Sequence, residues 1–589
     1  MNPRNYYTKR IEEVGTQLSE LKKKAVLFSI LRLSTFLATC ALTYLLFGRI
    51  KLVIVIVILG VALFLYLVSK YSDIKLSIAY LKKLIEINTT ELNVLNGDFS
   101  EIPDGKSFIY DDHHYNQDID LFGQGSLFQL INRTETKRGE ALLAFWLNEN
   151  SVENIKKKQE SNQELCDKVE FRQHFKATAA IVEGGNDSTP ILKWLLNYKP
   201  YLPAFTAYLP IVFSTISLSL ITAYLLGFIP GMYAVYWLIL GMVIVGQFVK
   251  KTTALYNSAT QAQDTLSQYG QLLNAIESES FKTELLRKQK QKIHEDQVTA
   301  SKKLNALTKD INYLGNRNNI FLTPIINGFF LWDIIFGRRI ESWICENAKN
   351  VKLWFEVIEH FDAQNSMATL AFNNPDYIYP NISEDESKTL IAEELGHPLL
   401  RKDKLVPNNV TINTRDFFII TGANMAGKST FLRTVALNLV MANCGLPVWA
   451  KSYSYKPTKL ISSMRTSDSL QNDESYFFSE LKRLKFIVDE MKNDEYFIIL
   501  DEILKGTNSK DKAEGSQKFV EKLVSSKSTG LIATHDLSLC ELSKTLPEIQ
   551  NHYFDAQIIE DELYFDYKMK DGICQNMNAS FLLRKMEIV

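Results

Sequence analysis

The sequence predicts a multidomain protein with α-helical N-terminal and core regions, about four transmembrane helices, and a C-terminal α/β domain. Three observations lead to this fold class. Residues 200–249 contain no Asp, Glu, Lys or Arg. The only charged residues in 25–68 are Arg32, Arg49 and Lys51. From about residue 380, short β-rich runs alternate with helical stretches, a pattern typical of an α/β domain with a parallel sheet.

Length and charge limit the classes of protein that need to be considered. The chain has 589 residues, which at about 100–200 residues per domain implies several structural units. Lys and Arg number 66 and Asp and Glu 67, so the net charge does not favour a dedicated polyanion-binding protein. Any nucleic-acid contact must be a local patch. The six cysteines show no CxxC spacing, which indicates a reducing compartment without structural zinc.

The uncharged stretches are long enough for two hairpins of membrane-spanning helices, because one span needs about 20 apolar residues. Gly and Pro residues predict the turn of the second hairpin at 227–231, and the first turn is expected at 48–51. The four expected spans are 25–48, 52–68, 207–226 and 232–249. The alternative, buried helices of a soluble bundle, stays open, more so for the first hairpin because Arg32 interrupts it.

Lysine residues flank the outer ends of the four expected spans, at positions 22, 23, 24, 70, 75, 199, 250 and 251. The positive-inside rule places these ends in the cytoplasm. Arg49 and Lys51 in the first turn argue against this orientation, but an even number of spans keeps both termini on one side. We therefore expect a multi-pass protein of the cell (cytoplasmic) membrane whose C-terminal domain faces the cytoplasm.

The expected organisation has seven segments, most of them helical because Gly and Pro are sparse in them. They are a cytoplasmic N-terminal helix at 1–25, transmembrane hairpin 1 at 26–69, a helical linker at 70–106, the first part of a helical core at 107–199, transmembrane hairpin 2 at 200–249, a helical arm with the second part of the core at 250–380, and the α/β domain at 381–589. The basic run 287–292 is interpreted as a solvated helix face.

A phosphate-binding loop is predicted between a buried strand at 416–421 and a helix that runs to Asn443. The residues between them match GxxxxGKS in a strand–loop–helix context. Glycines let backbone N–H groups close around phosphate oxygens, while Lys428 is expected to reach the β- and γ-phosphates and Ser429 to ligate Mg²⁺. The expected ATP contacts are Gly422, Ala423, Asn424, Met425, Ala426, Gly427, Lys428, Ser429 and Thr430.

Two further strands end in side chains suited to ATP hydrolysis. The apolar run 496–500 is followed by Asp501, expected to hold Mg²⁺, and by Glu502, expected to polarise water as a general base. The run 530–534 precedes His535, which at the carboxyl end of a strand faces the nucleotide crevice and is interpreted as a γ-phosphate sensor. Lys428, Glu502 and His535 are the predicted catalytic residues.

These motifs resemble the P-loop (ABC-type) ATPase domain of the MutS family, which is best known for DNA mismatch repair. The resemblance rests on TGANMAGKST at 421–430, LDEILKGTNSKD at 500–511, ATHD at 533–536 and ELGHPLL at 394–400. It covers about 107–180, similar to the family's helical core, and 310–589. The resemblance implies a Mg²⁺-dependent ATP hydrolase that uses ATP and works as a homodimer.

The resemblance also implies composite ATPase sites shared across the dimer. Ser475 would approach the partner's γ-phosphate, and Asn508 would lie near the dimer seam. An acidic pair, Asp473-Glu474, replaces the family's glycine before Ser475. Leu405 stands where the family often stacks an aromatic ring on adenine, so the adenine contact would fall to His397 and the proline that follows it.

The chain departs from the family in its hairpins. The first occupies the place of the mismatch-reading domain, and the second falls where helical arms of the family lead to a DNA clamp, so we expect the arms to end in lipid. The sequence is thus interpreted as a membrane-anchored MutS-like ATPase that couples ATP hydrolysis to conformational change. Mismatched or branched DNA and an unidentified membrane or repair partner are further expected ligands.

Two other classes of protein stay open. A single chain with membrane spans and an ABC-type ATPase domain is also how half-transporters are built, although no LSGGQ-like signature occurs and 428–501 leaves little room for an exporter's helical subdomain. A membrane-partner switch without DNA binding is the other reading. A scaffold that binds ATP without hydrolysing it fits poorly, because the residues expected for hydrolysis are all present: Lys428, Ser429, Asp501, Glu502 and His535.

Overall fold

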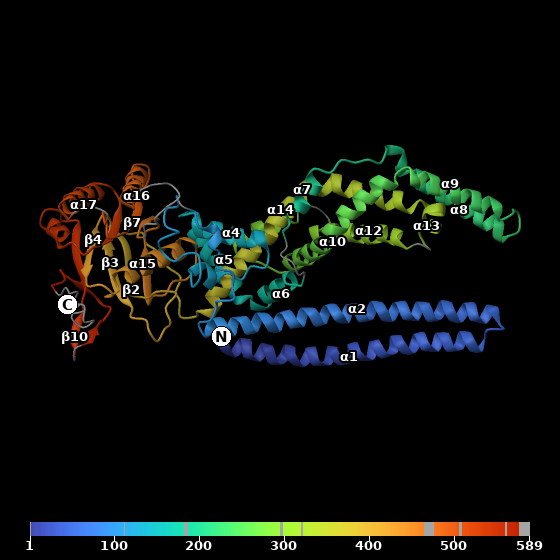
Figure 1. The fold of residues 1–589 in the computed structure, drawn as a ribbon, viewed down its shortest axis with the longest axis horizontal. Helices are drawn as coiled ribbons and strands as arrows, with labels where there is room; N and C mark the ends of the chain where they lie inside the picture. The colour runs from blue at the N-terminus through green and yellow to red at the C-terminus, as the bar shows by residue number, and fades with distance from the viewer. Residues whose placement is uncertain are drawn as a thin grey trace.

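A computed structural model describes residues 2–110, 112–181, 187–294, 298–319, 322–464, 476–505, 509–559 and 562–575. The molecule is elongated (Figure 1), with the α/β domain at one end, a helical core in the middle and two helical bodies at the other end. The first helix begins beside the core, and the last described strands lie in the α/β domain. The predicted helical regions and C-terminal α/β region are confirmed.

The first helical body is a long antiparallel hairpin of α1 (Pro3–Leu45) and α2 (Ile50–Leu95). The side chain of Asn2 accepts a hydrogen bond from the Asn5 N–H and so caps α1, and Pro3 suits the first helical turn. The two helices approach closely where Gly60 faces Thr39. The expected N-terminal helix, the first span pair and the linker as far as Leu95 are therefore stretches of two uninterrupted helices, and the rest of the expected linker, to residue 106, is not α-helical.

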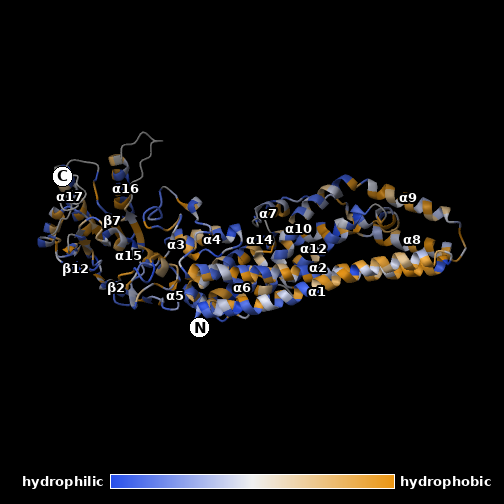
Figure 2. Ribbon diagram, turned by 60° about the horizontal axis from the view of Figure 1, so that its bottom comes forward, coloured by the Kyte–Doolittle hydropathy of each residue, from blue (hydrophilic) through white to orange (hydrophobic). Residues whose placement is uncertain are grey.

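The second body contains α8 (Leu209–Leu225), α9 (Met232–Gly246) and a short helix, α13 (Thr323–Phe330). Figure 2 shows apolar residues concentrated in the distal halves of α1 and α2 and in α8 and α9. Among the described residues, α1 and α2 are each long and apolar enough to cross a membrane. The helix α9 qualifies only together with α10, across a bend of 65°, and α8 is a shorter apolar helix. The count of four spans stays a prediction.

The core consists of helices that pack around the longest of them, α14. They are η1 (Lys106–Phe108), α3 (Leu127–Ile131), α4 (Lys137–Asn148), α5 (Ile155–Asp167), α6 (Val169–Ala179), α7 (Thr189–Leu196), η2 (Ala204–Ala207), α10 (Val249–Ser278), α11 (Glu284–Gln291), α12 (Ala300–Gly315), η3 (Asn316–Asn318) and α14 (Trp332–Asn373). In the basic run, Lys288 pairs with Glu284, and Lys290 donates to backbone carbonyls at the end of α10. These contacts support reading that run as a structural helix face.

The α/β domain is built on a six-stranded sheet of order β12-β9-β4-β8-β7-β6, in which only β12 is antiparallel to its neighbour. Its strands are β4 (Phe417–Gly422), β6 (Lys459–Ser463), β7 (Tyr496–Asp501), β8 (Thr529–Ala533), β9 (Ile549–Phe554) and β12 (Met569–Asp571). A second sheet has the order β1-β5-β2-β3 and contains β1 (Asn381–Ile382), β2 (Lys388–Leu395), β3 (Asn408–Asn413) and β5 (Ser452–Tyr455). The strands β10 (Gln557–Ile559) and β11 (Glu562–Tyr564) form a separate two-stranded sheet.

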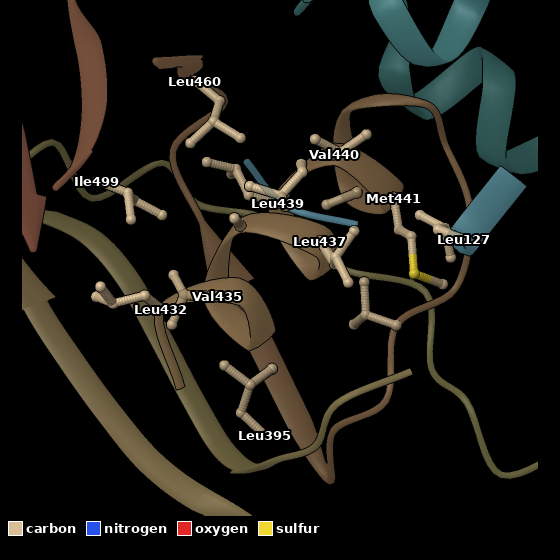
Figure 3. Close-up of a cluster of buried hydrophobic side chains, with 14 of the residues drawn as sticks. Leu127, Leu395, Leu432, Val435, Leu437, Leu439, Val440, Met441, Leu460 and Ile499 are labelled. Carbon is tan, nitrogen blue, oxygen red and sulfur yellow. The ribbon is translucent and has the colours of Figure 1, made fainter. Parts of the chain in front are cut away.

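The helix α15 (Lys428–Asn443) fills the space between these sheets and the core. Figure 3 shows its Leu432 and Val435 beside Leu395 of β2, and its Met441 beside Leu127 of α3. The remaining helices of the domain are α16 (Tyr476–Glu490), α17 (Ser509–Val524) and η4 (Leu537–Lys544). Because α15 is anchored along its length, its N-terminus is held at the carboxyl end of β4.

Candidate functional site

The loop between β4 and α15 has a backbone conformation that only glycine tolerates at two positions. Gly422 has φ 150° and Gly427 has φ 104°, both in the region disfavoured for L side chains. A Cβ atom on Gly422 would also lie 2.5 Å from the Phe554 carbonyl oxygen. The loop delivers the chain into α15 with unpaired N–H groups at the helix N-terminus, which suits an anionic ligand.

Lys428 is the first residue of α15 and is held inside this loop. Its Nζ donates to the carbonyl oxygens of Gly422 (2.7 Å) and Ala423 (3.0 Å) and lies 3.3 Å from His535 Nε2. Burial lowers the pKa of Lys428, and the carboxylates of Asp501 and Glu502 oppose that shift. The ammonium thus lies within the loop, where incoming phosphate oxygens could replace the loop carbonyls.

A hydroxyl and a carboxylate lie side by side next to Lys428. Ser429 Oγ donates to Asp501 Oδ2 at 2.6 Å, and Asp501 is the last residue of β7. Hard oxygen donors of this kind fit Mg²⁺, which is usually held by one or two protein oxygens together with substrate phosphates and water. Among the described residues, no group of three or more His, Cys, Asp or Glu side chains forms a metal site built from protein alone.

Glu502 follows Asp501 with a left-handed backbone (φ 51°), an uncommon conformation for a residue other than glycine. Its N–H donates to the Ala533 carbonyl oxygen, and its Oε1 lies 3.1 Å from His535 Nε2. The hydrogen bond from His535, with a contribution from Lys505, lowers the pKa of Glu502 to about 2. The carboxylate is therefore ionised at neutral pH and paired with His535 in this state.

A cavity of about 490 Å³ opens beside the glycine loop, and Gly427 and Thr430 form part of its wall. His397 and Leu405, both named from the sequence, line it, and so does Tyr567, which the sequence did not single out. Burial lowers the pKa of His397 to about 4, so its ring is neutral at pH 7 and suits an uncharged base. The cavity and loop together fit a nucleotide with its phosphates on the loop.

Ser475 and Asn508 lie outside the described residues. Met425 is 77% exposed at the tip of the loop, where it contributes backbone rather than side chain. The sequence signal that could have pointed to Tyr567 is weak, because a single aromatic residue between two short strands has no spacing that marks it.

The segment 112–120 joins the helical core to the α/β domain near this site. Arg483 of α16 donates to the carbonyl oxygens of His113 (2.7 Å) and His114 (2.6 Å). Arg433 of α15 bonds the Asp118 carbonyl and pairs with the Asp120 carboxylate. The two histidines bond different partners, the Asn148 carbonyl and Glu490, so they do not form a shared metal site.

The glycine loop, the lysine and two carboxylates meet at the carboxyl ends of a parallel sheet, an arrangement typical of a nucleotide-binding α/β domain. The family model for MutS domain V matches residues 418–584. MutS protein homolog 4 of Homo sapiens is 32% identical over 214 residues, 34% of this chain and 22% of that protein. The DNA mismatch repair protein MutS of Leptospira interrogans is 33% identical over 247 residues (40% and 28%), and that of Thermotoga maritima 30% identical over 268 residues (43% and 33%).

Residues 418–584 are therefore a MutS domain V, and over this part the chain is similar to MutS proteins. It spans between a fifth and a third of the length of these curated relatives. What the chain does as a whole is therefore a matter for proposal.

Proposed function

We propose that this protein is a membrane-anchored MutS-type ATPase that binds and hydrolyses ATP with Mg²⁺ and couples hydrolysis to a conformational change. The observation that carries the proposal is the convergence of Lys428, the Ser429–Asp501 pair and the Glu502–His535 pair at adjacent strand ends. Hydrolysis requires a phosphate cradle, a metal-holding carboxylate and a base for water, and these groups match that set in type and position.

Each group has a distinct task in the proposed reaction. ATP supplies the scissile phosphoanhydride bond, and Mg²⁺ neutralises charge on its phosphates. Lys428 would exchange its loop carbonyls for phosphate oxygens, and Ser429 and Asp501 would hold the metal. Glu502 would accept a proton from the attacking water, for which it must leave His535, and the released imidazole could donate to the γ-phosphate.

The site is proposed to be completed by a second copy of the chain. Ser475 and Asn508, named by resemblance to the family, would lie at the seam between two α/β domains. The helix α16 begins directly after the segment that contains Ser475, and its Arg483 donates hydrogen bonds to the segment 112–120 of the core. Closure of a dimer at this seam would therefore pull on the core through α16.

Three long helices can carry such a movement toward the membrane. Their core-side ends meet in one buried polar cluster of Tyr7 (α1), Glu91 (α2) and Asn373 (α14). Tyr7 OH donates to Asn373 Oδ1, Asn373 Nδ2 donates to Glu91 Oε2, and Arg133 Nε donates to Glu91 Oε1, at distances of 2.7, 2.7 and 2.6 Å. We propose this cluster as the joint between the ATPase domain and both helical bodies.

The two helical bodies are proposed to anchor the protein in the cell membrane with the α/β domain in the cytoplasm. Large apolar side chains face outward along them, including Leu45 (74% exposed), Phe47 (82%), Leu225 (76%) and Phe228 (78%). Exposed apolar surface on this scale is costly in water and favourable in lipid. Lysines at the core-side ends of the apolar stretches fit the positive-inside rule.

DNA is proposed as a second ligand because the relatives named above include DNA mismatch repair proteins. Titration of the detergent-solubilised protein with duplex, mismatched and branched DNA, at low and high salt and with and without ATP, tests this. Absence of binding to all three would remove DNA from the proposal and favour a membrane-partner switch. ATP-driven flux of solute in vesicles would instead support the transporter alternative.

Replacement of the proposed base tests the ATPase itself. Glu502→Gln should reduce steady-state ATP turnover at least about 100-fold, because general-base catalysis contributes roughly that much, while binding of a fluorescent ATP analogue is retained. Glu514→Gln, which alters an exposed carboxylate on α17 paired with Lys518, is the matched control and should keep wild-type turnover. Unchanged turnover in Glu502→Gln would overturn the proposal and favour ATP as structural glue.

A further inference from the structure

The segment that links the arm helix α12 to α14 is uncharged from Asn318 to Trp332. Its helix, α13, has eight residues and contains Pro324, Asn327 and Gly328, so it is far too short to be recognised as a membrane span. In the structure α13 lies against α8 and α9 near the core-side end of that hairpin (Figure 1). It therefore belongs to the proposed membrane region rather than to the helical core.

Close contacts lock α13 to both helices of the hairpin. A Cβ atom on Gly241 of α9 would lie only 2.2 Å from the Gly328 carbonyl oxygen, so the two helices touch backbone to backbone. Ser217 Oγ of α8 lies 2.6 Å from the Phe329 carbonyl oxygen and accepts a hydrogen bond from Trp237 Nε1. Small residues that allow close helix approach, joined by interhelical hydrogen bonds, are typical of packing within membranes.

The positions of these contacts indicate the depth of α13. Ser217 follows the start of α8 at Leu209 by about two turns, and Gly241 precedes the end of α9 at Gly246 by more than one turn. At 1.5 Å per residue, the contacts lie roughly 8–12 Å from the core-side ends of both helices. The hydrocarbon layer is about 30 Å thick, so α13 falls within its cytoplasmic half.

The turn from α13 into α14 has the polar pairing that a lipid environment demands. Leu331 adopts a left-handed conformation, and its N–H donates to the Asn327 carbonyl oxygen. The Asn327 side-chain oxygen accepts a hydrogen bond from the Asp333 N–H, and Ser217 Oγ donates to the Phe329 carbonyl oxygen. Irregular backbone at membrane depth is tolerated only when such groups are satisfied within the protein.

Aromatic and cationic side chains mark the level at which this segment leaves the proposed membrane. Trp332 Nε1 donates to the Tyr313 carbonyl oxygen, and Arg317 pairs with the buried Asp333. Arg338 and Arg339 follow within two turns on α14. Trp, Tyr and basic residues of this kind are enriched where a protein crosses from hydrocarbon to headgroups.

We propose that residues 322–332 form a re-entrant membrane segment that enters and leaves on the cytoplasmic side. Leu322, directly before α13, and Ile325 on α13 are 40% and 50% exposed, and they contact the acyl chains of the cytoplasmic leaflet. This proposal rests on the membrane anchoring of α8 and α9 proposed above. It makes the second helical body a three-helix membrane unit whose third helix continues directly into α14.

Site-specific fluorescence quenching in nanodiscs tests the proposal. Single cysteines are introduced into a cysteine-free background as Ile325→Cys on α13, Val235→Cys on the exposed face of α9 and Asn312→Cys on the exposed face of α12, and each is labelled with bimane. The full-length protein is placed in lipid with brominated acyl chains, or in ordinary lipid with iodide in the buffer. The label at Ile325→Cys should be quenched at least about threefold more by brominated lipid than by iodide.

The two controls separate this proposal from the one on which it rests. Val235→Cys should respond to brominated lipid and Asn312→Cys to iodide. If Val235→Cys responds to lipid but Ile325→Cys responds only to iodide, or to neither quencher because a protein covers it, the re-entrant segment is wrong while the anchoring stands. If neither Val235→Cys nor Ile325→Cys responds to lipid, the anchoring fails first, and this inference fails with it.

Discussion

Tyr567 lines the cavity beside the glycine loop, although it lies far from that loop along the chain. A Cβ atom on Gly427 would approach its ring to 3.1 Å, and Asn408 Nδ2 donates to the Tyr567 carbonyl oxygen at 3.0 Å. The residue has φ 52°, so the backbone is held in an uncommon conformation that presents the ring to the cavity. In a chain with leucine at the position where the family often has an aromatic, Tyr567 offers an aromatic surface for the proposed adenine contact, with Phe431 and Phe554 in the same cavity wall.

Loss of that ring should weaken nucleotide binding. Tyr567→Ala is expected to raise the Kd of a fluorescent ATP analogue about fivefold, corresponding to about 1 kcal/mol for an aromatic contact. Tyr567→Phe keeps the ring and should bind as the wild type does. Tyr564→Ala, at an exposed ring on the neighbouring strand β11, controls for surface effects. Equal affinity of Tyr567→Ala and Tyr564→Ala would show that the base does not use this ring.

The other residues of the site could be named before the structure was known, for a physical reason. Lys428, Asp501 and His535 each follow an apolar strand, and parallel strands place their carboxyl ends at one edge of a sheet. A strand–loop–helix pattern therefore implies proximity without any knowledge of long-range contacts. Tyr567 carries no such pattern, because its position depends on how the last strands return to the sheet.

The close contact between helices α9 and α13 depends on the absence of a side chain at Gly241. Gly241 faces the Gly328 backbone so closely that a methyl group has no space, whereas Gly246 in the same helix has nothing within 4 Å of a Cβ position. The contact joins the hairpin to the start of α14. It is therefore the place where the second helical body is fastened to the helix that reaches the ATPase domain.

Adding a methyl group at these two glycines should have opposite effects. Gly241→Ala is expected to lower the midpoint of thermal unfolding in nanodiscs by several degrees, because overpacking against backbone costs about 1–3 kcal/mol. Gly246→Ala should leave the midpoint unchanged or raise it slightly, since alanine favours helix. A midpoint for Gly241→Ala equal to that of Gly246→Ala would contradict the packing described for α13.

The continuity of α1 and α2 has a cause that also explains why their boundaries were expected elsewhere. Near residues 25 and 69 the sequence changes between charged side chains, which favour water, and apolar side chains, which favour lipid. No residue at either place breaks a helix. The hydrogen bonds of the backbone therefore continue across both places. The opposite holds for α13. There Pro, Asn and Gly interrupt an apolar stretch that is too short to be predicted as a membrane span.

In the molecule as a whole, rigid helices lead from the ATPase domain to the far end of both helical bodies. The helix α1 has 43 residues and so is about 65 Å long. A rotation of about 5° at its root, where Tyr7 bonds Asn373, would move its tip by roughly 6 Å. Small rearrangements at the proposed nucleotide site would thus become large displacements at the proposed membrane end.

Spin labels at the tips test this lever. Phe47→Cys and Phe228→Cys, both highly exposed in the wild type, are combined in a cysteine-free Glu502→Gln background. Their distance distribution, measured by pulsed electron paramagnetic resonance, should shift by several ångströms when ATP and Mg²⁺ are added. An unchanged distribution with bound ATP would contradict the proposed transmission.

The buried polar cluster supplies the matched variants for that experiment. Tyr7→Phe removes the hydroxyl that donates to Asn373 and should reduce the ATP-dependent shift, because the root of α1 is then less firmly tied to α14. Tyr6→Phe removes a neighbouring hydroxyl that has no hydrogen-bond partner among the described residues and should keep the full shift. Equal shifts in the two variants would exclude the cluster as the joint.

The amino-acid sequence was sufficient to predict the helical regions, the C-terminal α/β region, the MutS resemblance and the residues at the strand ends, because each depends on local periodicity or on a contiguous motif. Only the tertiary structure revealed the cavity wall at Tyr567, the docking of α13 on α8 and α9, and the meeting of Tyr7, Glu91 and Asn373. These features join residues from distant parts of the chain, and no local pattern encodes such contacts. They arise only when the long helices and the sheet pack together.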